Sequence, residues 1–164
     1  MYTRESELVR DFAYLLRARM APWPDLDIAF EFNYQSGRVD VVGVSVAGEL
    51  FSFEAKLTYW RKALHQAYRS TAFSHHAYVV LPEPTAKKAA MYCQDFELRG
   101  VGLCSVSPSG IAVEIPAFPQ DPFLTELTGN ALQYITRTKN MELAWSANDT
   151  SLNAGDRPRV QQAT

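Results

Sequence analysis

Three charged residues in the segment 37–56 have the types and spacing that metal-assisted cleavage of a phosphodiester requires. Asp40 lies in one apolar run of this segment, and Glu54 and Lys56 lie in the next. Two carboxylates and the backbone carbonyl of Ala55 can hold a hard divalent ion such as Mg2+, which keeps several of its waters. Such an ion polarises a phosphoryl oxygen and activates water, while a lysine stabilises the charge that develops. The segment therefore predicts a metal-dependent hydrolytic site.

Two strands joined by a short turn must position these side chains. The first spans about residues 38–46 and is rich in valine with little alternation, which predicts burial on both faces. The second spans about 50–56 and alternates, so that Glu54 and Lys56 project from the same face. An odd number of loop residues, with Gly48 at a positive φ, would place Asp40 on that face too. An even loop would place Asp40 on the opposite face unless a bulge corrects it.

Further helices and strands surround this hairpin. Helical spacing of apolar residues predicts a helix over 4–20, and alternation predicts a strand over 26–34 with Ile28, Phe30 and Phe32 on one face. The remaining expected elements are a helix over 60–73, a strand over 77–81, a helix from Pro84 to about 99, a hairpin over 101–115 and a helix over 122–138. This order indicates one α/β domain over residues 1–138, followed by a flexible tail over 139–164.

Composition narrows the setting and the partners. With 164 residues the chain is long enough for one hydrophobic core, and its net charge of -2 gives no overall basic field for nucleic acid. Contact with nucleic acid would need a local patch, for which Arg38, Lys62 and Arg69 are the candidates, with Lys87 and Lys88 as further cations. No apolar run approaches the roughly 20 residues that span a bilayer. Two lone cysteines, Cys93 and Cys104, expected to be buried, and a charged first segment favour a reducing, cytoplasmic location.

The segments GRVD at 37–40 and FEAK at 53–56 resemble the PD-(D/E)xK, or restriction-endonuclease-like, nuclease superfamily. The resemblance implies an αβββαβ core, with a mixed central sheet flanked by helices, over about residues 4–82. The C-terminal hairpin and helix would then be additions. No proline precedes Asp40, where Arg38 and Val39 stand instead, and position 70 is a serine where some branches have a tyrosine four residues after the glutamine. These departures concern the branch of the superfamily rather than the core motif.

The resemblance also implies a role for each site residue. Asp40 and Glu54 correspond to the metal-binding acids, and Lys56 corresponds to the catalytic lysine. Glu7 is expected to be the first-helix glutamate that supports the metal, with Glu5 as the other choice, and Gln66 on the helix after the lysine joins the catalytic set. The implied cofactor is Mg2+ or Mn2+, and the implied activity is a nuclease acting on nucleic acid, most naturally DNA.

Each candidate residue has a structural alternative. Asp40 could form a salt bridge with Arg38 or Lys56, and Glu54 and Lys56 could be the solvated face of an edge strand. Glu7 could be an ordinary surface charge, while His75 and His76 have no third ligand spaced for zinc. An acid in a buried, valine-rich strand is costly without a partner or an ion, which favours a functional Asp40.

Two other functions therefore stay open beside the nuclease. One is a catalytically inactive module of the same fold that binds nucleic acid or a protein, although the complete Asp, Glu and Lys set argues against a decayed site. The other is an unrelated α/β interaction protein that docks a partner through the helix 122–138, which the pI of about 5.9 favours. A nuclease acting on two strands would suit a homodimer. The pattern gives no indication of duplex or single-stranded substrate.

Overall fold

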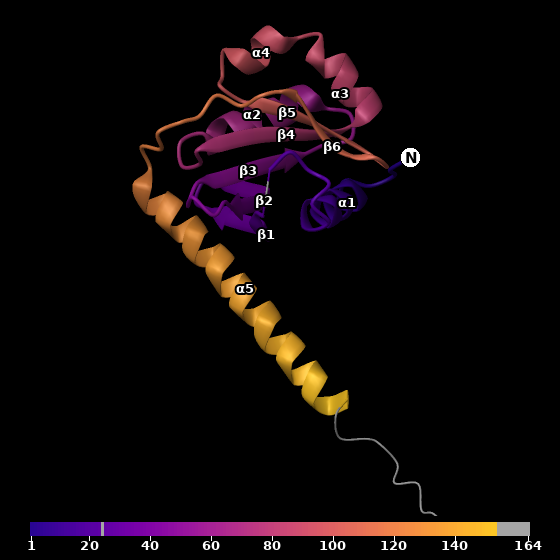
Figure 1. Ribbon diagram of the computed structural model, residues 1–164. Helices are drawn as coiled ribbons and strands as arrows, with labels where there is room; N and C mark the ends of the chain where they lie inside the picture. The colour runs from indigo at the N-terminus through magenta and orange to yellow at the C-terminus, as the bar shows by residue number, and fades with distance from the viewer. Residues whose placement is uncertain (24, 154–164) are drawn as a thin grey trace, which may run out of the picture.

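A computed structural model describes residues 1–23 and 25–153, in which six strands form one mixed sheet with helices on both faces (Figure 1). The strands are β1 (Asp27–Tyr34), β2 (Gly37–Val44), β3 (Leu50–Ala55), β4 (His76–Pro82), β5 (Gly102–Ser107) and β6 (Gly110–Ile115). They lie side by side in chain order. The pairs β3–β4 and β4–β5 are parallel, and the other neighbouring pairs are antiparallel.

Five helices accompany the sheet in the described part of the chain: α1 (Glu5–Arg17), α2 (Trp60–Ser70), α3 (Glu83–Ala90), α4 (Cys93–Glu97) and α5 (Thr125–Asn153). The element order from α1 to β4 is αβββαβ, as the sequence predicted. One long helix after Pro84 was expected, but the structure has α3 and α4 separated by a short break. Helix α5 continues through residues 139–153, where a tail was expected, and the rest of that tail, 154–164, lies outside the described residues.

Helix α1 covers one face of the sheet because its apolar residues recur at helical spacing. Leu8, Phe12, Leu15 and Leu16 are buried, and the ring of Phe12 meets the ring of Phe53 on β3 edge to face, with centroids 4.9 Å apart. Helices α2 and α3 cover the other face, where the buried alanines 63, 67, 86 and 89 allow close packing on β4 and β5. β3 is thus covered on both sides, and every residue of it is buried.

The turn between β2 and β3 has the geometry that the site requires. Ser45 N donates to Glu49 O at 3.0 Å, which leaves a three-residue loop closed by Gly48 at φ +84. A side chain at that φ is strained, so glycine fits the position. The odd loop that the sequence left open is confirmed.

The hairpin β1–β2 changes face halfway along its length. Ile28, Phe30 and Val41 pack with α1, whereas Phe32 and Val39 pack on the opposite face, near α5. The prediction that Ile28, Phe30 and Phe32 share one face is therefore wrong. The cause lies at Glu31, whose φ of +53 interrupts the alternation of side chains along β1.

Helix α5 lies along β1 and then leaves the domain (Figure 1). Its buried residues Ala131 and Ile135 pack against Phe32 and Val39, and Lys139 forms an ion pair with Asp27 at 2.8 Å. Glu142 reaches Arg17 at the end of α1, at 3.3 Å. These contacts hold the first half of α5 against the edge strand and also shield that edge.

Both cysteines are free. Cys104 is buried in β5 as expected, but Cys93 begins α4 and is exposed, so the expectation of burial is wrong for Cys93. The break between α3 and α4 changes the phase of the helical pattern and turns Cys93 outward. No helix in the described part of the chain is long and apolar enough to cross a membrane.

Candidate active site

Asp40 and Glu54 meet where β3 separates from the longer hairpin β1–β2. The pairs Val41↔Phe53 and Val42↔Ser52 set the register of β2 and β3, and continuing this register places Asp40 opposite Glu54. On the N-terminal side of Val41, the residues of β2 pair with β1, and among the described residues they have no backbone pairing with β3. Asp40 Oδ2 accepts a hydrogen bond from Ala55 N at 2.9 Å, which fixes the aspartate against the end of β3.

Glu54 is buried without a partner. Its exposed fraction is 3%, and among the described residues no hydrogen bond or ion pair reaches its carboxylate. β3 is a central strand between β2 and β4, so the alternative that Glu54 lies on the solvated face of an edge strand is wrong. Buried polar side chains are normally hydrogen-bonded, and an unpaired one in a native fold calls for a physical reason.

Burial raises the pKa of both acids. Burial, followed by the charge of Asp40, raises the pKa of Glu54 to about 8, although Lys56 opposes the shift. Burial also raises the pKa of Asp40, and the Ala55 N–H and Lys56 hold this rise in check. At neutral pH the pair therefore tends to keep a proton, which a bound cation could replace.

Lys56 follows β3 directly and lies against the start of α1. Its Nζ donates to Glu5 Oε2 at 3.0 Å and to the carbonyl oxygen of Ala55 at 3.1 Å. A carbonyl oxygen has two lone pairs, so that of Ala55 can accept from Lys56 and still coordinate an ion. Among the described residues neither Lys56 nor Arg38 forms an ion pair with Asp40, since Arg38 pairs with Glu31 at 3.6 Å. The salt-bridge alternative for Asp40 therefore fails.

The first-helix carboxylate at the site is Glu5. Glu7 instead caps its own helix: its Oε2 accepts from Thr3 N at 2.8 Å and from Arg4 N at 3.3 Å. The bond to Thr3 N is the main cause that lowers the pKa of Glu7. The sequence preference for Glu7 over Glu5 is corrected, because residues two apart on a helix point in different directions.

Gln66 lies on α2, and its Oε1 is buried without a hydrogen-bond partner in the described structure. No hydrogen bond within residues 1–23 and 25–153 joins Gln66 to Asp40, Glu54 or Lys56. The structure thus leaves the predicted catalytic role of Gln66 without a direct contact. An unsatisfied amide oxygen can nonetheless accept from a donor that the folded chain does not itself supply.

The three expected nucleic-acid contacts differ in their surroundings. Arg38 lies on β2 close enough to Asp40 and Glu54 to lower the pKa of both, though burial outweighs it. Arg69 donates to Ser36 O and so ties α2 to the turn between β1 and β2. Lys62 is exposed near the start of α2 and has no ion pair with any described residue. Arg69 therefore has a structural role of its own, whereas Lys62 is free to meet a phosphate.

The donor set fits a hard ion better than zinc. Within residues 1–23 and 25–153, no three His, Cys, Asp or Glu side chains gather closely enough to hold a metal. His75 and His76 have other contacts, as His75 Nδ1 accepts from Leu50 N at 2.9 Å and the His76 ring stacks on Phe51. Asp40, Glu54 and the Ala55 carbonyl supply oxygen ligands only, and Mg2+ bound by one or two carboxylates keeps waters in its remaining positions.

The position of Glu31 opposite Asp40 was not predicted from the sequence. The register of β1 and β2, with Phe30↔Val41 and Phe32↔Val39, places Glu31 opposite Asp40. Its left-handed backbone turns its exposed carboxylate toward Arg38 and away from a regular cross-strand position. A glutamate carries no sequence signal for positive φ, so only the folded backbone reveals it.

Comparison with solved structures shows that another protein shares this fold, and it does not identify an activity. A protein of unknown function from Silicibacter pomeroyi has a similar structure over 98% of this chain and 100% of its own, with a TM-score of 0.64 at 13% sequence identity. A repair endonuclease from Pyrococcus abyssi matches 66% of this chain and 49% of its own, with a TM-score of 0.44 at 19% identity. No family model matches the chain, and no curated protein matches it either. The likeness to the first structure shows a shared fold alone.

Proposed function

We infer that the protein is a divalent-metal-dependent nuclease of restriction-endonuclease-like fold, which hydrolyses phosphodiester bonds in DNA and uses Mg2+ or Mn2+. The observation that carries this proposal is Glu54, a glutamate buried on a central strand beside Asp40 with no protein partner. A buried glutamate that faces a half-buried aspartate is unfavourable unless a proton or a cation lies between them. The element order αβββαβ over α1 to β4 also supports the proposed restriction-endonuclease-like fold.

Asp40, Glu54 and the carbonyl of Ala55 would hold the metal ion. When bound, the ion would polarise a phosphoryl oxygen and activate a water for attack. The hydrogen bond from Ala55 N would keep Asp40 in place, and the short turn at Gly48 would keep β2 and β3 in register. Rigid strands hold such a site to a precision that loops seldom reach.

Lys56 would act beside the ion. Its ammonium lies at the Ala55 carbonyl, at the end of β3 near both acids, where it can donate to the attacking water and to the charge on the phosphoryl group. Glu5 would act as a positioning residue, because its ion pair holds the flexible lysine on the side of α1. Breaking that pair on substrate binding would release the ammonium toward the phosphate.

The decisive experiment measures cleavage of single-stranded and duplex DNA with Mg2+ or Mn2+, for the natural protein and for the variants Asp40→Asn and Lys56→Ala. We expect no cleavage by Asp40→Asn and a loss of about 10²- to 10³-fold for Lys56→Ala, in line with the loss of one preorganised donor. Glu97→Gln is the matched control, since it changes an exposed acid on α4.

If the natural protein cleaves no DNA or RNA with either metal, the nuclease proposal fails. A thermal shift with Mg2+ then decides what remains. Stabilisation that Asp40→Asn abolishes would leave a metal-binding module without catalysis, because only a ligand of the folded state stabilises by mass action. No stabilisation would leave the carboxylates as structural residues of an interaction protein.

A further inference from the structure

A groove runs along α1 and ends at Asp40, one of the two carboxylates of the proposed ion site. Its walls are α1, from Glu5 to Arg17, and the hairpin residues Phe30, Glu31 and Arg38. It encloses about 680 Å3, which lies in the range of small-molecule sites, about 300–1,000 Å3.

The charges along this groove nearly cancel. Three arginines line it (Arg10, Arg17 and Arg38), and three acids line it as well (Glu5, Glu31 and Asp40). Each arginine forms an ion pair: Arg10 with Asp11 at 3.7 Å, Arg17 with Glu142 at 3.3 Å and Arg38 with Glu31 at 3.6 Å. A balanced surface cannot match the dense charge of a duplex by counterion release alone, so binding here needs another source of affinity.

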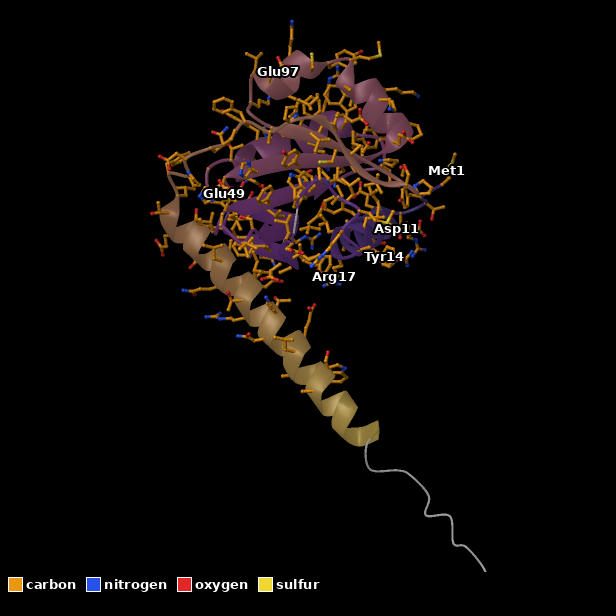
Figure 2. All side chains as sticks on the ribbon, viewed as in Figure 1. Met1, Asp11, Tyr14, Arg17, Glu49 and Glu97 are labelled. Atoms are coloured by element: carbon orange, nitrogen blue, oxygen red, sulfur yellow. The ribbon has the colours of Figure 1, made fainter. Side chains whose placement is uncertain are left out.

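Aromatic rings supply that source. Tyr14 is 68% exposed on the groove side of α1, and Figure 2 shows it beside Arg17 at the lower edge of the domain. Phe30 lies half-buried in the opposite wall, with the Arg17 guanidinium 5.8 Å from its ring centre. An exposed aromatic ring beside an arginine can bind an unpaired base, because every base has a face that can stack.

We propose that this groove binds a single strand of DNA, with a base stacked on Tyr14 and the backbone led toward Asp40. The proposal rests on the proposed function for the role of Asp40, and it adds the form of the substrate. Arg17 and Arg38 exchange their exposed carboxylate partners for phosphates as the strand enters, at little cost because exposed ion pairs are weak. A duplex offers no free base to Tyr14 and is therefore bound more weakly.

The test measures binding without chemistry. Fluorescence anisotropy of a labelled oligodeoxythymidine and of a duplex of equal length is recorded in EDTA for the natural protein, Tyr14→Ala and Phe118→Ala. Phe118 is the matched control, because it is 71% exposed and lies outside the groove. We expect the single strand to bind at least about tenfold more tightly than the duplex, and Tyr14→Ala alone to lose about tenfold.

Equal binding of both DNA forms, or equal effects of Tyr14→Ala and Phe118→Ala, would overturn the proposal. Melting temperatures of both variants within about 2 °C of the natural protein exclude a folding defect, as expected for exposed positions. The outcome is separate from that of the cleavage assay. Metal-dependent cleavage of duplex DNA without a preference for single strands would support the nuclease proposal and contradict the groove proposal. Tyr14-dependent binding of single strands without cleavage would support the groove proposal and contradict the nuclease proposal.

Discussion

Ser52 and Glu54 lie two residues apart on β3, face the same side of the sheet and are almost equally buried, at 2% and 3% exposed. Ser52 belongs to a closed network: its hydroxyl lies 2.8 Å from that of Ser74, which donates to Ser70 O at 2.8 Å. Glu54 has no such partner in the described part of the chain. Hydrogen bonds within the fold therefore satisfy one buried polar position, while the other has none among the described residues.

Burial alone does not distinguish these two positions, whereas their hydrogen bonds do. The serine network joins β3 to the end of α2 and the loop before β4, and so it helps to fix the packing of the parallel half of the sheet. For Glu54 and Asp40, in contrast, burial raises the pKa of both carboxyls, and the charge of Asp40 raises the pKa of Glu54 further. A fold keeps such a repulsive pair only where another function compensates for its cost in stability.

The largest expected effect is on the pH dependence of stability. The folded state raises the pKa of Glu54 from 4.5 to about 8, so the folded protein keeps a proton that the unfolded chain releases in this range. Stability should fall as the pH rises from about 4.5 to about 8, by roughly 5 kcal/mol in the absence of metal. Glu54→Gln should remove most of this slope. Urea denaturation at several pH values measures it, and an equal slope in the variant would show that Glu54 is not the group.

The affinity for a metal ion should depend on whether Glu54 is protonated. Because the carboxylates must lose protons to coordinate an ion, the affinity for Mg2+ should rise by up to about tenfold per pH unit and level off near the pKa of about 8. Isothermal titration calorimetry at several pH values up to about 8 measures this affinity. The variant Asp40→Asn should bind no ion. A pH-independent affinity would place the ion away from Glu54.

Breaking the serine network should have a smaller effect, and one that does not depend on metal. Ser52→Ala leaves the buried hydroxyl of Ser74 with one partner fewer and should cost about 1–2 kcal/mol of unfolding free energy. The cost should be equal with and without Mg2+ and at low and high pH, which urea denaturation can establish. If the loss of unfolding free energy in Ser52→Ala depended on Mg2+, the serine network would be coupled to the ion site, and the difference between Ser52 and Glu54 would not hold.

The smallest effect concerns the backbone beside Asp40. Glu31→Gly removes a side chain from φ +53 and should stabilise the protein by about 0.5–1 kcal/mol. Ala112→Gly, at an exposed position of β6 outside the positive-φ region, should instead destabilise by a similar amount. Thermal melts compare the two. If both variants lose stability, Glu31 compensates for its strained backbone through its ion pair with Arg38.

The pattern of residue types was sufficient to predict much of the site. Alternation along 50–56 placed Glu54 on a strand, but the sequence left open whether the turn at Gly48 has the odd number of residues that brings Asp40 opposite Glu54. These are local properties, because strand alternation and turn geometry depend on neighbouring residues. The choice between Glu5 and Glu7 was different, since two acids in one helical turn look alike until the helix has docked and one of them meets Lys56.

By itself, the sequence determined the order of the elements from α1 to β4 and the pairing of β2 with β3, and it proposed Asp40, Glu54 and Lys56 as candidate site residues. Only the tertiary structure decided that Glu54 is buried without a partner, that Glu31 turns the hairpin β1–β2 from one face to the other and that α5 continues to Asn153. The physical reason is that burial, strain and electrostatic coupling arise between segments distant in the chain. Local propensity contains no information about such distances.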